Sequence, residues 1–417
     1  MAPKTENLWL SRFAAFTALC TLALICVGGV VTSKGAGMAV PDWPTSYGYN
    51  MFFFPIDRWV GGIFYEHTHR LFAVLVGLLT SILAAWLWGR EATGRARWMG
   101  WIVIVVLLAM LGQHGSGDGT GVAGGVPIHF QALALIMPLL LVAGVVQSIR
   151  TGGSLRWLAM TAFFAVILQG ILGGLRVVLF RDQIGVFHAT LAQLFLSLLA
   201  VIALLTSSVW NRWTGGRDAV KPSRELRRLS FVCTLLILAQ LVLGATMRHQ
   251  HAGLAIADFP TAYGKLWPAM DAASIARYNQ ARVEVGAVNP ITAFQVGLQL
   301  MHRIVALLIA LGVALCALLA RRQLGRGNPL RRLSSLWFGM ILLQAFLGAA
   351  TIWTGKSADF ATAHVAVGAF SLATGALAMM FATSLSVPAR SGASAVHGRR
   401  SDTPAVLAPP TAATNAG

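Results

Sequence analysis

Charged residues are scarce in this chain. Asp, Glu, Lys and Arg make up 11% of its 417 residues, whereas soluble domains carry about 25%. Apolar residues make up 56%, and many of them form runs of about 20 residues, the length that spans a bilayer as a helix. This composition excludes a soluble globular domain and predicts an all-α polytopic membrane protein.

Acidic residues are rarer than basic ones: the chain has 14 Asp and Glu against 32 Lys and Arg, a formal net charge of +18. A basic surplus can indicate nucleic-acid binding. Here, however, Lys and Arg gather in short connections between apolar runs, as the positive-inside rule requires, and the sequence contains no nucleic-acid motif. We therefore expect the lipid bilayer, and no nucleic acid, as a partner.

Cysteine is also rare. The four cysteines lie within apolar runs and none has CxxC spacing; they are Cys20, Cys26, Cys233 and Cys316. This pattern excludes a disulfide framework and predicts small buried hydrophobic side chains.

Ten apolar runs are long enough to be transmembrane helices, with 98–112 the shortest. They cover approximately residues 13–31, 64–88, 98–112, 129–149, 157–179, 185–209, 229–247, 295–320, 334–353 and 361–384. No convincing cleavage site follows the first run, so we expect it to be a retained helix rather than a signal peptide.

Basic residues predict the orientation of these helices. The N-terminus, the C-terminus and the connections after the second, fourth, sixth and eighth runs hold 21 of the 32 Lys and Arg residues. Both termini are therefore predicted to be cytoplasmic, and the long loops 32–63 and 248–293 to face outward. Residues 388–417 are rich in Ala, Ser, Pro, Thr and Gly and are predicted to form a disordered cytoplasmic tail.

Four segments of the chain recur further along it. The matches are GMAVPDWPTSYG (37–48) with GLAIADFPTAYG (253–264), His69-Arg70 with His302-Arg303, LQGILGG (168–174) with LQAFLGA (343–349), and His188 with His364. The first match is identical at seven of twelve positions, and the successive offsets are 216, 233, 175 and 176. These matches predict a tandem parallel repeat of two four-helix bundles.

The fall of the offset from 233 to 175 indicates an insertion of 58 residues in the first repeat. We therefore predict a first four-helix half at residues 1–97 and 157–212 and an inserted transmembrane helix pair at 98–156. The second four-helix half is predicted at 213–387, followed by the tail at 388–417.

Four of the ten histidines occupy repeat-matched positions: His69, His188, His302 and His364. Each lies near the start of an outside-to-inside helix, where an ionisable side chain is costly and usually functional. Two per half at one depth indicate two buried sites, each clamped by two imidazoles, which suit iron, copper or zinc. With two ligands per site and no Cys or carboxylate cluster, the pattern favours a metal held in a macrocycle, that is, a haem with bis-histidine ligation.

Glu66 distinguishes the two predicted sites. It lies three residues before His69 and therefore on the same helix face, whereas the second half has Gln299 at the matching place. His67 lies about 100° around the helix from that face and is expected to point elsewhere. The carboxylate predicts that the first half holds the reactive site and that the second half holds a permanently bound cofactor.

Together these motifs resemble the heme A synthase family. The motifs are Glu66-x-x-His69-Arg70, LQGILGG with the His188 helix, Met301-His302-Arg303, Ala363-His364, and the loop PDWPTSYG with its echo DFPTAYG. The resemblance covers nearly the whole chain except 98–156 and the tail, although the Cys pair of some members is absent from the first loop. It implies oxidation of the C8 methyl group of heme O to a formyl group, giving heme A for cytochrome oxidase in a bacterial cytoplasmic membrane.

The resemblance also implies roles for single residues. His302 and His364 would ligate a bound haem b in the second half, and the substrate heme O would lie near His69 and His188. Glu66, His69 and His188 are thus candidate catalytic residues, and all four histidines are candidate iron ligands.

Arg70 and Arg303, together with Arg176, are candidate partners of the haem propionates because arginine binds carboxylates in a bidentate manner. The expected partners are an electron donor, a heme O synthase and cytochrome oxidase assembly factors.

Two other classes of protein remain compatible with the four histidines. A di-haem b-type cytochrome would transfer electrons in the membrane without modifying haem, and would need neither Glu66 nor an exchangeable haem. A haem transporter or haem-binding assembly factor is the further alternative.

Overall fold

The computed structural model describes residues 7–112, 127–215, 222–281 and 290–384. Within these ranges every regular element is a helix, and ten helices are long and apolar enough to cross a membrane. The prediction of an all-α polytopic membrane protein with about ten transmembrane helices is therefore confirmed. The predicted tail at 388–417 lies outside the described residues.

Four helices of the N-terminal part close into a ring, which we call the first ring. They are α1 (Leu8–Ser33), α2 (Gly61–Glu91), α5 (Leu155–Val178) and α6 (Asp182–Leu205). α1 packs on α2, α2 on α5, α5 on α6, and α6 back on α1. Fully buried side chains such as Leu83, Phe163 and Ile202 fill this ring. Because lipid is as apolar as these side chains, the helices are held mainly by close van der Waals packing.

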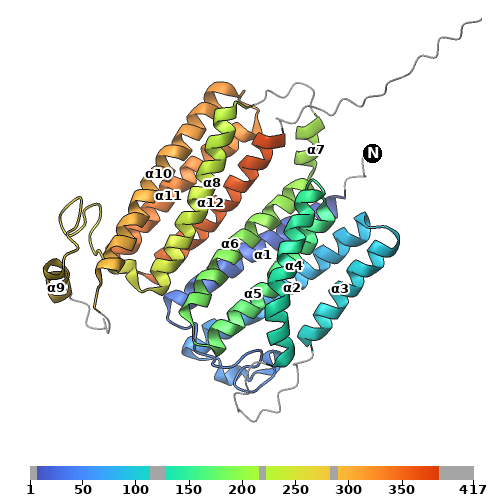
Figure 1. The fold of residues 1–417 in the computed structure, drawn as a ribbon, viewed down its shortest axis with the longest axis horizontal. Helices are drawn as coiled ribbons and strands as arrows, with labels where there is room; N and C mark the ends of the chain where they lie inside the picture. The colour runs from blue at the N-terminus through green and yellow to red at the C-terminus, as the bar shows by residue number, and fades with distance from the viewer. Residues whose placement is uncertain (1–6, 113–126, 216–221, 282–289, 385–417) are drawn as a thin grey trace, which may run out of the picture. The chain divides into compact units, whose positions relative to one another are not determined.

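The C-terminal part forms a second ring. It contains α8 (Arg224–His249), α10 (Ala293–Gln323), α11 (Pro329–Trp353) and α12 (Ala358–Ser384), which Figure 1 shows in colours from yellow-green to red. α8 packs on α10, α10 on α11, α11 on α12, and α12 back on α8, around Leu226, Val313 and Trp337.

The two rings meet through four helices, because α12 packs on both α1 and α6, and α6 packs on α8. In the predicted repeat, α1, α2, α5 and α6 correspond to α8, α10, α11 and α12. The rings thus have the same order of packing, which supports the repeat. The repeat itself and the boundaries of its halves stay predictions.

The predicted insertion at 98–156 coincides with α3 (Gly94–Gly112) and α4 (Ile128–Arg150). α3 packs on α2, and α4 packs on α5. Buried residues make up 17% of the α3 span and 22% of the α4 span, against 61% for α5. The outer faces of both helices are apolar, with Leu139 and Ile149 among the most exposed side chains, as expected for helices that face lipid.

Polar capping residues fix where several helices begin. The Asn7 side chain accepts from Leu10 N (3.1 Å) at α1, and the Ser223 side chain accepts from Leu226 N (3.1 Å) at α8. Thr292 forms a capping box with Gln295 at the start of α10. These side chains satisfy N–H groups that the first helical turn leaves unpaired.

Two short helices differ from the sequence-based expectation. The sequence predicts one continuous span at 185–209, but α6 ends at Leu205 and α7 (Ser208–Gly215) follows. The helix breaks at Ser207, whose hydroxyl accepts from Trp210 N (3.3 Å) and caps α7. α9 (Ala272–Gln280) lies in the predicted outer loop 248–293, where the Asp271 side chain caps it.

Candidate functional site

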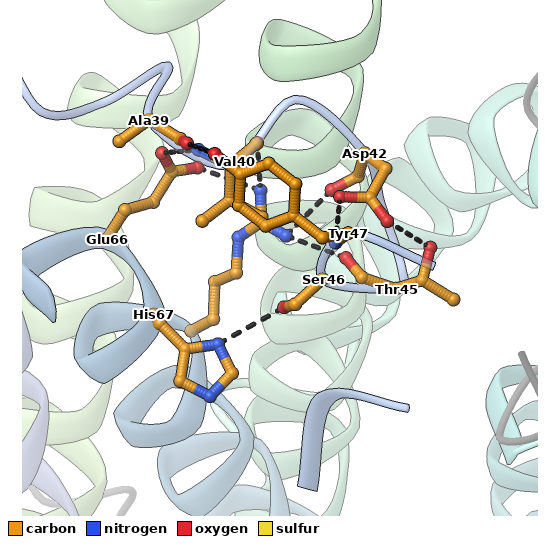
Figure 2. A network of polar contacts seen from close by, with 9 residues as sticks. Ala39, Val40, Asp42, Thr45, Ser46, Tyr47, Glu66 and His67 are labelled. Atoms are coloured by element: carbon orange, nitrogen blue, oxygen red, sulfur yellow. Dashed lines mark hydrogen bonds and ion pairs between the residues drawn. The ribbon is translucent and has the colours of Figure 1, made fainter. Parts of the chain in front are cut away.

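The first loop, residues 34–60, folds around Asp42 (Figure 2). Asp42 Oδ1 accepts a hydrogen bond from Tyr47 N (2.6 Å), and Oδ2 accepts from Gly48 N (2.8 Å) and Thr45 Oγ1 (2.6 Å). The Tyr47 hydroxyl donates to Ala39 O (2.6 Å). Gly48 has a φ of 74°, which glycine adopts without strain. These bonds hold residues 39–48 in a compact turn.

The same bonds stabilise the charged form of Asp42. Partial burial alone would raise the pKa of this carboxyl group. The hydrogen bonds from Gly48, Thr45 and Tyr47 act in the opposite sense, and the net result is a pKa below the ordinary value. The hydrogen bonds of the loop therefore favour the ionised form of Asp42.

Glu66 and Arg70, which we call the first latch, join this turn to α2. Glu66 is 3% exposed; its Oε2 accepts from Val40 N (2.9 Å) and its Oε1 pairs with Arg70 Nη2 (2.8 Å). Arg70 also donates to the carbonyl oxygens of Val40 (2.8 Å), Asp42 (2.7 Å) and Thr45 (2.9 Å). Both terminal nitrogens of Arg70 are thus engaged by the loop, and a role of Arg70 toward a propionate stays a prediction.

The second loop, between α8 and α10, contains the same turn around Asp258. Its Oδ1 accepts from Tyr263 N (2.7 Å), and its Oδ2 accepts from Thr261 Oγ1 (2.7 Å) and Gly264 N (2.9 Å). The Tyr263 hydroxyl donates to Ala255 O. Every one of these residues lies 216 positions after its counterpart in the first loop.

Gln299 and Arg303, the second latch, join this turn to α10. Gln299 Oε1 accepts from Ile256 N (2.5 Å), and its Nε2 donates to Ile256 O (3.1 Å) and Gly253 O (3.2 Å). Arg303 donates to the carbonyl oxygens of Thr261 (2.8 Å) and Asp258 (2.7 Å). The second latch therefore holds its loop in the same way without a carboxylate.

His67 belongs to the first loop rather than to the site of His69. Its Nδ1 lies 3.1 Å from Ser46 Oγ, and its ring packs on Phe54 and Trp59 at centroid distances of 5.0 and 4.7 Å. The structure thus agrees with the expectation that His67 points away from the His69 face.

Each repeat-matched histidine packs against a glycine of the preceding helix in its ring. A Cβ atom on that glycine would lie 3.0–3.3 Å from the Cε1 atom of the imidazole; the pairs are Gly28–His69, Gly173–His188, Gly244–His302 and Gly348–His364. Any larger residue would displace the imidazole, so glycine sets the position of all four imidazoles. Gly28 and Gly244 are 216 residues apart, and Gly173 and Gly348 are 175 apart, the offsets of the repeat.

His302 and His364, which we call the second site, face each other across the second ring. Their ring centroids are 6.4 Å apart and their planes meet at 57°. Two metal–nitrogen bonds of about 2 Å, plus about 1 Å from each nitrogen to its ring centroid, need a separation of about 6 Å. Nδ1 of His364 lies 3.1 Å from Gln344 O, the outer contact that orients a metal-ligating histidine. These residues fit a haem iron with two axial imidazoles.

His69 and His188, which we call the first site, lie on α2 and α6, the helices that correspond to α10 and α12 of the second site. Both residues are partly accessible, yet their Nδ1 atoms are buried without a hydrogen-bond partner among the described residues, as is Nδ1 of His302. A buried polar atom without a partner costs about 1–3 kcal/mol. The first site thus retains polar groups that the fold itself does not satisfy, as expected of a binding site.

Glutamines hold the helical turns that carry these histidines. Gln169 Nε2 donates to His188 O (3.1 Å), and Gln240 Nε2 donates to His302 O (2.8 Å). Gln344, the repeat match of Gln169, instead places its Nε2 3.4 Å from His364 Nε2.

Other candidate metal ligands do not gather around these sites. Among the described residues no three His, Cys, Asp or Glu side chains come together as a metal cluster. His129 packs on Phe130 at a centroid distance of 4.5 Å, with the two rings tilted by 42°. The ring of His249 packs against Gly185 of α6.

The sequence alone did not reveal two groups of residues. One is the glycines that pack on the histidines, and the other is the aspartates at the centres of the loops. The signal for both was present, since these residues occur at the offsets that relate the two halves. The glutamines were harder to find, because Gln240 has no match in the first half, where Leu24 stands 216 residues earlier.

Comparison with known proteins adds independent information. Residues 129–375, more than half of the chain, match the model of a family described as cytochrome oxidase assembly protein, COX15-CtaA. The chain is 24% identical over 361 residues to a heme A synthase of Methylobacterium radiotolerans, covering 85% of this chain and 84% of the relative. It is 22% identical over 234 residues to a heme A synthase of Staphylococcus aureus strain RF122, covering 56% of this chain and 69% of the relative.

Proposed function

Because the chain belongs to the COX15-CtaA family of cytochrome oxidase assembly proteins, we propose that it is a heme A synthase. In this proposal it oxidises the C8 methyl group of heme O to a formyl group, giving heme A for cytochrome oxidase. The observation that carries the proposal is the pair of histidine sites, in which four imidazoles are each set by a glycine at repeat-related positions.

The second site is proposed to hold haem b through His302 and His364. A haem bound there supplies a one-electron redox centre. The protein contributes the fixed spacing of the two imidazoles and, at His364, a carbonyl group that orients the ring. This arrangement suits a permanently bound cofactor, because both ligands are positioned before it binds.

The first site is proposed to bind the substrate, heme O, between His69 and His188. Its imidazoles are set by Gly28 and Gly173, so the two sites present the same pair of ligands to a porphyrin. What separates a substrate site from a cofactor site must therefore lie in the residues around the histidines.

Glu66 is proposed to be the residue that makes the first site catalytic. Gln299 holds the second loop without a charge, and Arg303 does so without a carboxylate partner. A carboxylate at position 66 is therefore not needed to hold the loop. We assign it the role of a proton acceptor or of a fixed negative charge that stabilises positive charge on the substrate. Arg70 and Arg303 are proposed to shape the outer rims of the two sites through the loops that they hold.

The proposed location is a bacterial cytoplasmic membrane, crossed several times, with both termini in the cytoplasm and both histidine sites toward the outer side. The proposed partners are an electron donor, a heme O synthase that supplies the substrate, and cytochrome oxidase assembly factors that receive the product.

The haem composition of the purified protein tests this function. When the protein is produced in a host that makes heme O, the extracted pigment should contain haem b together with heme A or a hydroxylated intermediate. A host without heme O synthase provides the control and should yield haem b alone. Two equally retained haem b groups in both hosts would instead support the di-haem electron-transfer cytochrome.

A further inference from the structure

A basic pocket lies between the ends of α10 and α11 that are remote from the histidines. Its volume is about 480 Å³, and it is lined by Arg321, Arg326, Arg331, Arg332 and Ser335. α10 and α11 pack on each other (Figure 1), and Arg326 belongs to the short connection between them. Four of the five side chains that line this pocket end in guanidinium groups, and we call it the arginine pocket.

Hydrogen bonds hold the wall of the arginine pocket. Arg321 Nε donates to Ser335 Oγ (3.3 Å), which itself donates to Arg331 O (3.1 Å). Arg331 Nη1 donates to a carbonyl oxygen of the connection (3.0 Å), and Arg332 Nε donates to Arg326 O (3.4 Å). Within the described part of the chain, no hydrogen bond uses the Nη groups of Arg321 or Arg332. These groups are therefore positioned donors that a ligand can use.

The segment that builds the pocket carries positive charge alone. It has five arginines within residues 321–332, and no Asp or Glu occurs between residues 285 and 358. α10, α11 and their connection thus supply no carboxylate to balance these charges, which repel one another. Arg331 also lies in the first turn of α11, where the helix dipole disfavours a cation. An anion bound in the pocket would offset both effects.

The position of the pocket along α10 places it at the level of lipid headgroups. Arg321 follows Arg303, which holds the second outer loop, by 18 residues of continuous helix. This separation is about 27 Å along the helix axis, close to the roughly 30 Å thickness of the hydrocarbon core. The arginine pocket therefore lies at the membrane surface opposite the outer loops.

Apolar side chains continue from the pocket toward the middle of the membrane. Leu318 on α10 is 51% exposed and Leu336 on α11 is 53% exposed. Leu318 lies three residues before Arg321, and Leu336 lies four residues after Arg332, so each leucine shares a helix face with a pocket arginine. A phosphate group held in the pocket would place its acyl chains along these leucines.

We propose that the arginine pocket binds the phosphodiester headgroup of an anionic phospholipid. Arginine binds phosphate through two parallel hydrogen bonds, and basic pockets between transmembrane helices suit anionic headgroups. Free phosphate would use the same donors but would make no contact with the leucines, so a lipid is the source that fits the whole surface. This inference does not depend on the proposed function.

The test compares two phospholipids that share acyl chains and phosphate but differ in net charge. Dioleoyl phosphatidylglycerol or dioleoyl phosphatidylcholine is titrated into the purified protein in neutral detergent, and bound lipid is measured by native mass spectrometry. The wild type should bind the anionic lipid roughly tenfold or more tightly. The double variant Arg321→Gln with Arg332→Gln should lose most of that preference, and the corresponding double lysine variant should keep part of it.

The matched control is the double variant Arg228→Gln with Arg322→Gln. Both residues are exposed at the same end of the second ring, where Ser223 N donates to Gln323 Oε1 (3.1 Å), and neither lines the pocket. This variant removes the same charge and should keep the preference. Far-UV circular dichroism and the elution volume check that each variant is folded.

Three results would overturn the lipid site. The first is a wild type without preference, or a preference that persists in the pocket variant. The second is an equal loss in the control variant, which would show that net charge and not the pocket attracts the lipid. The third is complete displacement of the anionic lipid by 10-fold excess inorganic phosphate, which would make the pocket a site for free phosphate.

Discussion

The two outer loops close on their helices through matched hydrogen bonds, but the first latch is an ion pair and the second is not. Glu66 and Gln299 each accept from a backbone N–H of the loop, Val40 in one case and Ile256 in the other. Arg70 and Arg303 each donate to loop carbonyl groups. The comparison teaches that a loop of this shape can be held without a carboxylate, which is the basis for the catalytic role proposed for Glu66.

The two histidine sites also differ in the charged residues at matched positions. Both contain two imidazoles set by glycines, but α2 carries Glu66 one turn before His69, and α5 carries Arg176 one turn after Gly173. In the second half these positions are Gln299 and Thr351. The surroundings of the two sites thus differ at two matched positions, which are a carboxylate and a guanidinium in the first half and an amide and a hydroxyl in the second.

The largest effect should come from removing an imidazole of the second site. His302→Ala should abolish binding of haem b at that site, because one axial bond and the spacing of 6.4 Å to His364 are lost together. The haem content per chain, measured by pyridine haemochrome spectra, should fall accordingly. His251→Ala, an exposed loop histidine, is the control and should retain full haem content.

The reciprocal variant tests whether the sites are independent. His69→Ala should lose the substrate porphyrin and keep the haem b spectrum. If His69→Ala loses haem b and His302→Ala keeps it, the assignment of the two halves is reversed.

The next effect should come from making the first latch resemble the second. Glu66→Gln keeps an acceptor for Val40 N and an amide that can reach the loop carbonyls, as Gln299 does. We expect the loop and the haem b spectrum to be preserved and heme A formation to fall at least about 100-fold, the range for loss of a general acid or base. Gln299→Glu is the control and should leave heme A formation largely intact. Normal activity in Glu66→Gln would show that Glu66 only holds the loop.

Spacing along the chain was sufficient to predict the ten helices, since runs of about 20 apolar residues have few alternatives in a membrane. Spacing also singled out the four histidines, because they occupy matched positions in the two halves, and it revealed the contrast between Glu66 and Gln299. It was not sufficient to place Arg248 of α8 against Gly29 and Ser33 of α1, because these helices belong to different rings. Contacts between rings depend on how helices pack, which no period in the sequence encodes. The break before α7 was missed because it depends on one serine hydroxyl within an apolar run.

A smaller effect is expected from the glycines that set the imidazoles. Gly348→Ala places a Cβ 3.1 Å from His364, and Gly173→Ala places one 3.2 Å from His188, so each ring must shift by a few tenths of an ångström. Gly348→Ala should weaken haem b binding, and Gly173→Ala should weaken substrate binding, each about tenfold. Gly339→Ala and Gly170→Ala are controls on the same two helices with open space around the Cβ. They should bind porphyrin normally and gain up to about 1 kcal/mol of helix stability. Equal losses in the controls would show that helix distortion, and not the contact with histidine, is responsible.

The smallest effect concerns the loops themselves. Hydrogen bonds keep the pKa of Asp42 and of Asp258 below the ordinary value of 3.8, despite partial burial that acts in the opposite sense. A carboxyl group with a lowered pKa in the folded state stabilises that state fully above its ordinary pKa and loses this contribution as the pH falls through the folded-state pKa. Asp42→Asn should therefore cost about 1 kcal/mol at pH 7, and its thermal unfolding midpoint should approach that of the wild type below about pH 4. Asp258→Asn should behave alike, because the two turns contain the same bonds. A cost of Asp42→Asn that stays constant down to pH 3 would mean that the charge of Asp42 does not hold the first loop.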